Sequence, residues 1–248
     1  MASDLMRWVG DYNIDVNSIV HIGAHLVQER DEYKTLGAEF VLWIEAMPWI
    51  SEKASRILRD YPNQELLSAL LWSETGIEKE FYVAGDNGSS SSVYKPYLIS
   101  ASHPEVQVSQ KIRLKTTTLD ELLEPYLHRL STSNILVLDT QGAELKVLHG
   151  GRNNLHVFDY LVTEVSIREL YKNAPTLREY VTQIEKFGFT LLEAKINRAT
   201  GWGDAIFIRS TMFQNKGFKS KIIRTGRYFP VRTLLRSVLV RLNNILSR

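Results

Sequence analysis

The sequence predicts an α/β protein with a mostly parallel sheet, helices on both faces and one antiparallel strand. Apolar runs alternate with amphipathic segments through the first two hundred residues, as expected for strands that alternate with helices. Acidic residues stand at or near the ends of three of these runs, namely Glu45, Asp139 and Glu164. Two later runs, 189–193 and 205–209, are joined by a glycine-containing loop, which predicts a terminal hairpin with an antiparallel edge strand.

The run Ile135 to Leu138 is the centre of this prediction. Four apolar residues lead directly into Asp139, which is typical of a parallel strand buried on both faces. A turn and a short helix ended by two glycines follow. Ligands of open α/β sheets bind outside the carboxyl ends of the strands, so Asp139 points to a site. The competing interpretation is that Asp139 only caps the turn.

The first strand–helix–strand unit carries a second signal. An apolar run at 18–24 breaks at Gly23, a helix is expected over 25–37, and the strand 40–44 ends in Glu45. An acidic residue about twenty positions after a glycine turn accepts hydrogen bonds from ribose hydroxyls. A dinucleotide fingerprint needs three glycines, and this turn has one. S-adenosylmethionine has a ribose but no phosphate, so the pattern favours it.

The remaining elements are predicted by periodicity, capping residues and proline. Pro48 begins a helix, and Thr118 and Thr176 begin two more with Glu three residues later. Pro125 should kink or end the first of these two helices. Four further strands are expected, at 65–72, 80–84, 106–117 and 159–165. The segment GDNGSSSS, Gly85–Ser92, is either a flexible loop or a hydroxyl-rich lip over a site.

Composition limits the classes of protein. The 248 residues include no cysteine, so disulfides, thiolate chemistry and cysteine-bound metals are excluded. No leader-like segment or long apolar stretch occurs, which predicts a soluble, cytoplasmic protein. Every Asp and Glu lies at or before Asp204, whereas ten Lys or Arg follow it. The sequence therefore divides into a domain, 1–210, and a basic tail, 211–248.

The tail is predicted to contain a basic amphipathic helix. Its apolar residues recur at helical spacing and arginines lie between them. The apolar positions are Val231, Leu234, Leu235, Val238, Leu239, Leu242, Ile245 and Leu246. The helix could pack on the domain, pair with a second copy to form a homodimer, or contact the inner face of a membrane through its charges. No motif that reads nucleic acid supports binding of DNA or RNA.

Several segments together resemble the FkbM family of S-adenosylmethionine-dependent methyltransferases. The segments are HIGAHLVQE (21–29), WIEA (43–46), DNGSSSS (86–92), TTTLDELL (116–123), LDTQGAELKVLHG (138–150) and GWGDAIF (201–207). The resemblance implies a class I methyltransferase fold, Rossmann-like, with a seven-stranded sheet whose last strand is antiparallel. It also implies O-methylation of hydroxyls on sugars, glycans or other natural products.

The resemblance assigns roles to individual residues. The positions expected at the cofactor are Gly23, His25, Glu29, Glu45, Ala46, Ser73, Asn87, Ser90 and Gln141. Gly23 would pass the methionine part and Glu45 would bind the ribose. Two residues depart from the family pattern: Val27 stands where glycine is frequent, and Gln141 where glutamate is frequent. Val27 could crowd the methionine pocket.

Three residues are candidates for the chemical step. Asp139 and Glu164 could share the acceptor hydroxyl as base, or converge on a divalent cation that lowers its pKa. His25 beside the glycine turn is an alternative base, whereas His21 lies inside a strand and is expected in the core. Two other functions compete: a non-catalytic methyltransferase-like binding module with Val27 blocking the cofactor, and a nicotinamide oxidoreductase, which the missing glycines disfavour.

Overall fold

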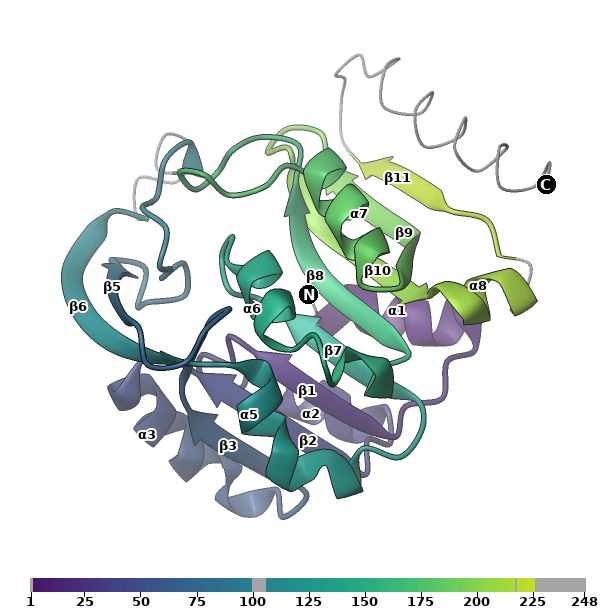
Figure 1. The fold of residues 1–248 in the computed structure, drawn as a ribbon, viewed down its shortest axis with the longest axis horizontal. Coiled ribbons are helices and arrows are strands. Elements are labelled where there is room, and N and C mark those ends of the chain that lie inside the picture. The colour runs from purple at the N-terminus through teal and green to yellow at the C-terminus, as the bar shows by residue number, and fades with distance from the viewer. Residues whose placement is uncertain (1, 100–105, 217, 226–248) are drawn as a thin grey trace.

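The computed structural model describes residues 2–99, 106–216 and 218–225 (Figure 1). Its helices are α1 (Ala2–Tyr12), α2 (Arg30–Thr35), α3 (Pro48–Ile57), α5 (Leu119–Leu123), α6 (Glu144–Gly150), α7 (Leu177–Lys186) and α8 (Ser210–Lys216). Its strands are β1 (Ser18–Ile22), β2 (Phe40–Glu45), β3 (Gln64–Ser68), β4 (Leu70–Leu71), β5 (Glu78–Ala84), β6 (Val108–Thr117), β7 (Asn134–Leu138), β8 (Tyr160–Ser166), β9 (Phe189–Asn197), β10 (Trp202–Arg209) and β11 (Lys221–Thr225). Strands and helices alternate as the sequence predicts.

The main sheet has eight strands in the order β11-β9-β10-β8-β7-β1-β2-β3. Strand β10 runs antiparallel to β8 and β9, and every other pairing is parallel. The seven strands from β3 to β9 therefore form the class I sheet with an antiparallel last strand. The hairpin is confirmed, but β10 lies between β8 and β9 rather than at the edge. Strand β11 adds an eighth strand beyond the boundary expected at residue 210.

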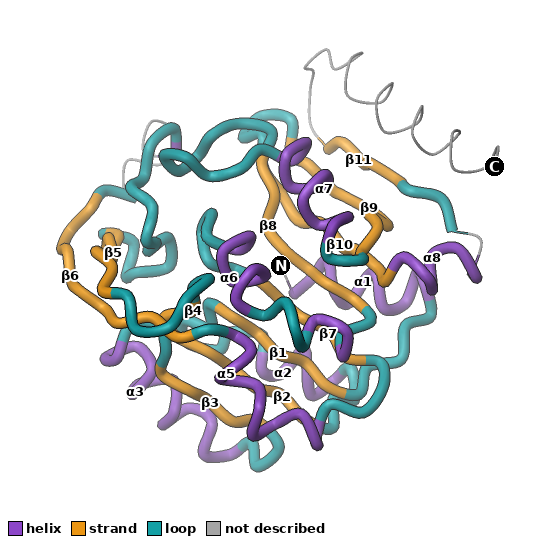
Figure 2. Tube along the Cα trace, in the orientation of Figure 1, coloured by secondary structure: helices purple, strands orange, loops and turns teal. Residues whose placement is uncertain are grey.

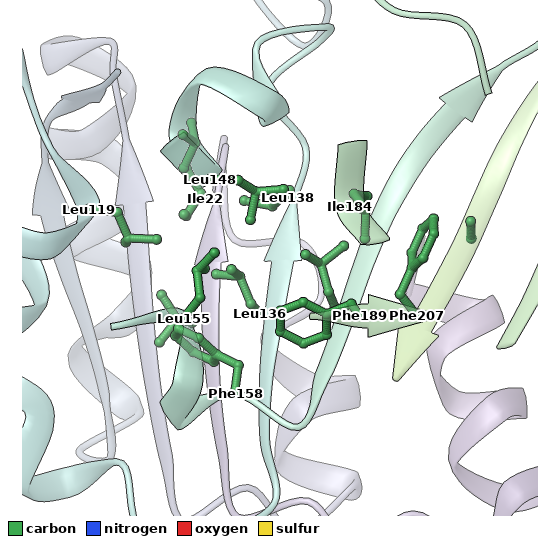
Figure 3. Close-up of a cluster of buried hydrophobic side chains, with 14 of the residues drawn as sticks. Ile22, Leu119, Leu136, Leu138, Leu148, Leu155, Phe158, Ile184, Phe189 and Phe207 are labelled. Carbon is green, nitrogen blue, oxygen red and sulfur yellow. The ribbon is translucent and has the colours of Figure 1, made fainter. Parts of the chain in front are cut away.

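Helices cover both faces of this sheet (Figures 1 and 2). One face packs against α5, α6 and α7, and the other against α1, α2, α3 and α8. Figure 3 shows side chains of the first face. Its labelled residues are Ile22, Leu119, Leu136, Leu138, Leu148, Leu155, Phe158, Ile184, Phe189 and Phe207. Burial of these side chains removes a large apolar surface from water, which stabilises the fold.

A second sheet, in the order β4-β6-β5, lies beside the carboxyl ends of the main strands. The strand expected at 65–72 is in fact two strands, because β3 pairs with β2 and β4 pairs with β6. Between them, the Ala69 amide donates to the Glu45 carbonyl at 2.9 Å. The break carries the chain from one sheet to the other, so β4 and β5 stand over the end of β2.

The helix expected from residue 25 begins only at Arg30. His25 and Val27 have φ angles of 44° and 49°, which are incompatible with a right-handed helix. Pro125 acts as predicted, since α5 ends at Leu123 and a 3₁₀ helix follows. The capping box of α7 is complete, whereas in α5 only the N-cap threonine makes its half of the box.

Helix α1 is fixed to the sheet by a buried carboxylate. Glu193 of β9 has no solvent exposure and accepts hydrogen bonds from Arg7 (2.6 Å), Trp8 (3.0 Å) and Tyr12 (2.8 Å). Burial alone would raise the pKa of Glu193, but the three donors outweigh it and hold the pKa below its ordinary value. Hydrogen bonds therefore hold the first helix of the chain against β9, a strand that comes late in the sequence.

The predicted tail helix and its apolar stripe lie outside the described residues. Within the described part, no helix is long and apolar enough to cross a membrane.

Candidate active site

The turn at Gly23 and the segment 138–150, which contains Asp139, meet at the carboxyl ends of β1 and β7. The Asp139 amide donates to the Ile22 carbonyl at 2.8 Å. Gly23 has φ +90°, and a Cβ there would lie 1.9 Å from the Asp139 carbonyl oxygen. A side chain at residue 23 would therefore displace the end of β7, so glycine is required by contact as well as by conformation.

Glu45 closes the same turn from β2. One carboxylate oxygen accepts from the His25 amide and the other from the Met47 amide, both at 2.8 Å. Burial raises the pKa of Glu45, and these two amides oppose that rise. Each carboxylate oxygen has a further lone pair, so Glu45 can still accept a ligand hydroxyl. The fold thus brings the predicted ribose acceptor into a cavity wall.

This cavity, which we call the first cavity, lies between the carboxyl ends of the main strands, the loop 85–92 and the second sheet. We call the loop 85–92 the serine loop. Four of the residues expected at the cofactor, Gly23, His25, Glu45 and Ala46, line it together with Asp139. The remaining lining residues are Ile22, Ile44, Met47, Ala69, Leu70, Leu71, Phe81, Gly88, Ser89, Ser91, Val93, Thr140 and Ala143. The walls are therefore mainly apolar, and among the described residues that form them there are two carboxylates and neither lysine nor arginine.

Asp139 is held by the residue two positions later. The Gln141 amide nitrogen donates to Asp139 Oδ1 at 2.5 Å. Within the described chain, the other carboxylate oxygen of Asp139 accepts no hydrogen bond, so it is available to a ligand. Asp139 lines the first cavity and also a second one on the other side of the strand end. It is therefore a wall shared by two cavities.

Three carboxyl groups form a row across the sheet. Leu138 of β7 pairs with Thr163 of β8, so the residues that follow them, Asp139 and Glu164, lie side by side. Asp204 of β10 pairs with Glu164. Burial, and then repulsion from neighbouring acids including Glu144 and Asp204, raises the pKa of Asp139 to about 7. Burial and the nearby Asp139 raise the pKa of Glu164 well above its ordinary value. The pair therefore retains a proton near neutral pH.

The second cavity lies over this row, beneath α1 and the β9–β10 hairpin. It is lined by Asp4, Asp139, Glu164, Lys195, Asn197, Thr200, Trp202, Gly203 and Asp204. Lys195 donates to Asp4 at 2.7 Å, so its charge is already paired. Lys195, Asn197 and Thr200 were not predicted from the sequence. The signal that could have found them is their position in the hairpin, next to the segment GWGDAIF.

His25 is engaged at both ring nitrogens. Gln28 lies 2.9 Å from Nδ1 and the Asn87 carbonyl lies 3.1 Å from Nε2. With the Gln28 amide as donor, Nδ1 accepts and Nε2 donates to the Asn87 carbonyl. The ring therefore links the glycine turn to the serine loop, and Asp139 is better placed than His25 to accept a proton. His21 is buried, as expected, and bonds to Tyr33.

Other predicted cofactor residues do not line the first cavity. Glu29 precedes α2, and Ser73 packs beside Gly150. Asn87 contributes its backbone carbonyl to His25, and Ser90 bonds to Asp86. Gly88, Ser89 and Ser91 line the cavity instead, so the serine loop is placed as predicted but different members of it form the wall.

Val27 does not crowd the cavity. Its side chain is fully buried in the core cluster on the α1 side of the sheet, away from the cavity-lining residues. Its φ of 49° explains why glycine suits this position, because a β-branched residue is strained there. The departure from the family pattern is therefore one of backbone conformation, and Val27 is not among the residues that line the first cavity.

The geometry gives no support for a metal site at Asp139 and Glu164. Across the residues that the structure describes, no group of three or more His, Asp or Glu side chains is arranged to hold a metal ion. The row of acids is better described as a set of buried carboxyls whose mutual repulsion, with burial, raises the pKa of Asp139 and Glu164.

The sheet order, the glycine turn and the acid at the end of β2 together define a class I methyltransferase fold. A family model described as a methyltransferase FkbM domain matches residues 20–191, more than half of the chain. The chain therefore belongs to the FkbM family of S-adenosylmethionine-dependent methyltransferases. The search of curated proteins gave no match.

A solved FkbM methyltransferase agrees with this chain at the level of the fold. A methyltransferase FkbM from Methylobacillus flagellatus KT has 13% sequence identity and a TM-score of 0.51, over 78% of this chain and 44% of that one. This chain thus spans less than half the length of that protein. Magnesium protoporphyrin IX methyltransferase from Synechocystis PCC 6803, solved with S-adenosylmethionine bound, has 10% identity and a TM-score of 0.48, over 84% and 78% of the two chains.

Proposed function

We propose that this protein transfers the methyl group of S-adenosylmethionine to a hydroxyl of a small-molecule or glycan acceptor, with Asp139 as the general base. The observation that carries the proposal is the position of Asp139 between two cavities. The first cavity suits the cofactor and the second is open to an acceptor. A base that borders both can receive the proton as the methyl group passes between them.

The first cavity fits the chemistry of S-adenosylmethionine. This cofactor has an adenine ring, a ribose, and a sulfonium and an ammonium that carry positive charge. Leu71 and Phe81 offer apolar surface, Glu45 offers a hydroxyl acceptor, and Asp139 adds negative charge. A phosphate-bearing dinucleotide would meet two carboxylates and no lysine or arginine among the described lining residues. The charge of the walls therefore favours the sulfonium cofactor over NAD.

The reaction needs alignment and removal of a proton. The hydroxyl oxygen attacks the methyl carbon, and the carbon–sulfur bond breaks with its electron pair remaining on sulfur. The hydroxyl proton passes to the uncommitted oxygen of Asp139. A pKa of about 7 suits this role, because a base is most effective when its pKa is near the working pH. Burial and the nearby Asp139 also raise the pKa of Glu164, and in its protonated form Glu164 can donate a hydrogen bond to the acceptor.

The second cavity supports a neutral or cationic, hydroxyl-rich acceptor such as a sugar. Asn197 and Thr200 supply hydrogen-bonding groups, and Trp202 supplies an apolar ring face. The acids Asp4, Glu164 and Asp204 would repel an acceptor that carries a carboxylate or phosphate near the reacting hydroxyl. Neutral methyl glycosides should therefore be better acceptors than the corresponding uronates.

Binding and transfer can be tested in sequence. A thermal-shift titration with S-adenosylhomocysteine should raise the melting temperature, since a ligand at a hundred times its Kd stabilises the native state by about 2.7 kcal/mol. NAD at the same concentration should not. Transfer of tritiated methyl to a panel of methyl glycosides then tests the reaction. Binding without transfer to any hydroxyl acceptor would favour the non-catalytic binding module.

Replacing Glu45 should weaken cofactor binding. We expect Glu45→Ala to raise the Kd for S-adenosylhomocysteine by roughly ten-fold to more than a hundred-fold, because a charge-assisted hydrogen bond is worth about 1.5–3 kcal/mol. Glu39→Ala, at the opposite end of β2, is the matched control. Calorimetry gives the Kd, and circular dichroism checks that the turn has kept its fold. Equal affinities in folded Glu45→Ala and wild type would remove Glu45 from the cofactor site.

A further inference from the structure

A buried tyrosine contacts the residue that holds Asp139. Tyr171 lies in the loop between β8 and α7, and only 2% of its surface is exposed. Its hydroxyl donates to Gln141 Oε1 at 2.6 Å, and Gln141 Nε2 donates to Asp139 Oδ1 at 2.5 Å. We propose that Tyr171 is a positioning residue, which fixes the Gln141 amide so that it holds the general base. This inference depends on the proposed role of Asp139.

The direction of the hydrogen bonds follows from chemistry. A carboxylate only accepts, so the Gln141 amide must present its nitrogen to Asp139 and its oxygen to Tyr171. The Tyr171 hydroxyl then has to donate. It also lies 3.2 Å from the Ser90 carbonyl, but the Gln141 contact is shorter. Without the hydroxyl, the amide would lose the partner that fixes its orientation, and its buried oxygen would lose a hydrogen bond.

The backbone of Gln141 is fixed independently of its side chain. Residue 141 has φ +56°, and the Ser92 hydroxyl donates to its carbonyl at 2.8 Å. Gly142 follows with φ +102°, where a Cβ would lie 2.8 Å from the Cβ of Ala174. The serine loop, the Asp139 turn and the Tyr171 loop therefore meet at one residue. The main chain sets where Gln141 starts, and Tyr171 sets where its amide points.

The ring and the hydroxyl of Tyr171 have separable roles. The ring packs in a small cluster with Ala84, Ile99 and Leu170, so phenylalanine would preserve this contact. The hydroxyl makes hydrogen bonds to Gln141 and to the Ser90 carbonyl, so its removal tests the hydrogen-bond relay from Tyr171 through Gln141 to Asp139 rather than the packing. Asp139 faces Glu164 from β8, Asp204 from β10, Glu144 from α6 and Glu29 from the turn before α2. Asp4 and Lys195 border the same second cavity.

The titration midpoint of Asp139 depends on a balance between the acids that face it and the Gln141 amide. The facing acids favour the protonated form, and the Gln141 amide favours the carboxylate. Loss of the oriented amide should therefore move the titration midpoint of Asp139 to higher pH. A role for Tyr171 confined to packing would leave the midpoint unchanged in Tyr171→Phe.

A double-mutant cycle with an acceptor-independent readout tests the relay. Carbon NMR of protein labelled at aspartate carboxyls follows Asp139, with its signal assigned by loss in Asp139→Asn and with EDTA present. We expect the midpoint to rise by about one pH unit in Tyr171→Phe and in Gln141→Ala. The double variant should show no further rise, because Tyr171 acts through Gln141. Tyr160→Phe is the control: it is similarly buried, but it begins β8, at the other end of the strand from Glu164.

The turnover of the same variants provides the functional arm. With tritiated S-adenosylmethionine and methyl glycosides, Tyr171→Phe should lower kcat about ten-fold and leave the Kd for S-adenosylhomocysteine unchanged. Additive shifts in the cycle, or a wild-type midpoint in Tyr171→Phe, would overturn the relay. Asp139→Asn with wild-type turnover would instead overturn the proposed function, so the two failures are distinguishable.

Discussion

Asp139→Asn is expected to lower kcat by about 10²–10⁴-fold, the usual contribution of a positioned base. Asparagine keeps the shape of the side chain but cannot accept the hydroxyl proton. The Kd for S-adenosylhomocysteine should change less than in Glu45→Ala, because this ligand has no sulfonium charge for Asp139 to attract, and Glu45 and the apolar walls of the first cavity are untouched. Methyl transfer to methyl glycosides gives kcat, and calorimetry gives the Kd.

Asp159→Asn is the matched control for this substitution. Asp159 precedes β8 at the opposite edge of the sheet and accepts from the Ser133 amide at 2.8 Å, so it is a capping carboxylate. Its replacement should cost stability and leave kcat unchanged. If Asp139→Asn behaves in the same way as Asp159→Asn, Asp139 is also only a cap.

The pH dependence of wild type follows from the raised pKa of Asp139. Only the deprotonated carboxylate can act as base, so kcat/KM should rise with pH up to about 7 and level off above it. The same shift acts on stability with the opposite sign. Between about pH 4 and 7 the folded state binds more protons than the unfolded state, so wild type loses stability as the pH rises.

Asp139→Asn removes this cost. Above pH 7 the variant should be more stable than wild type by on the order of 2–4 kcal/mol, and the difference should shrink toward pH 4. Thermal unfolding across this range measures it. Loss of activity together with a gain in stability would mark a group kept for catalysis. A variant less stable than wild type at pH 8 would contradict a raised pKa of the buried Asp139 carboxyl.

Glu193→Ala is expected to cost about 3–5 kcal/mol of unfolding free energy, the range for breaking a buried charged network. The substitution leaves a cavity and removes the acceptor of Arg7, Trp8 and Tyr12 at once. Urea unfolding monitored by tryptophan fluorescence is suitable, because Trp8 lies in the network. Asp4, which lines the second cavity, is on the same helix, so acceptor affinity should fall more than cofactor affinity.

Asp11→Ala is the matched control for Glu193→Ala. Asp11 pairs with the same Arg7 at 2.9 Å, but its side chain is 55% exposed. An exposed pair is worth about 0–1 kcal/mol. Equal losses in the two variants would show that burial of Glu193 contributes nothing. Because the pKa of Glu193 is lowered, its stabilisation should be present above about pH 4.5 and lost as the pH falls further, which is the reverse of Asp139.

The sequence by itself determined the elements whose causes are local. Apolar runs of four to six residues predicted β1, β2 and β7, and the acids at the ends of β2 and β7 marked the site edge. Pro125 and the threonine caps placed helix boundaries, since these effects act within one turn of helix. The family resemblance then implied a role for the glycine turn at the cofactor and a seven-stranded sheet with an antiparallel last strand.

Contacts between distant residues decided the rest. The sequence could not show that Asp204 lies opposite Glu164, or that Tyr171 reaches Gln141, because these pairs depend on strand register and loop packing. Nor could it show that Val27 points into the core. The shift of Asp139 toward neutral pH has the same origin, since burial and neighbouring acids from other elements produce it. Local pattern therefore set the position of the site along the chain, and tertiary packing set its protonation and its walls.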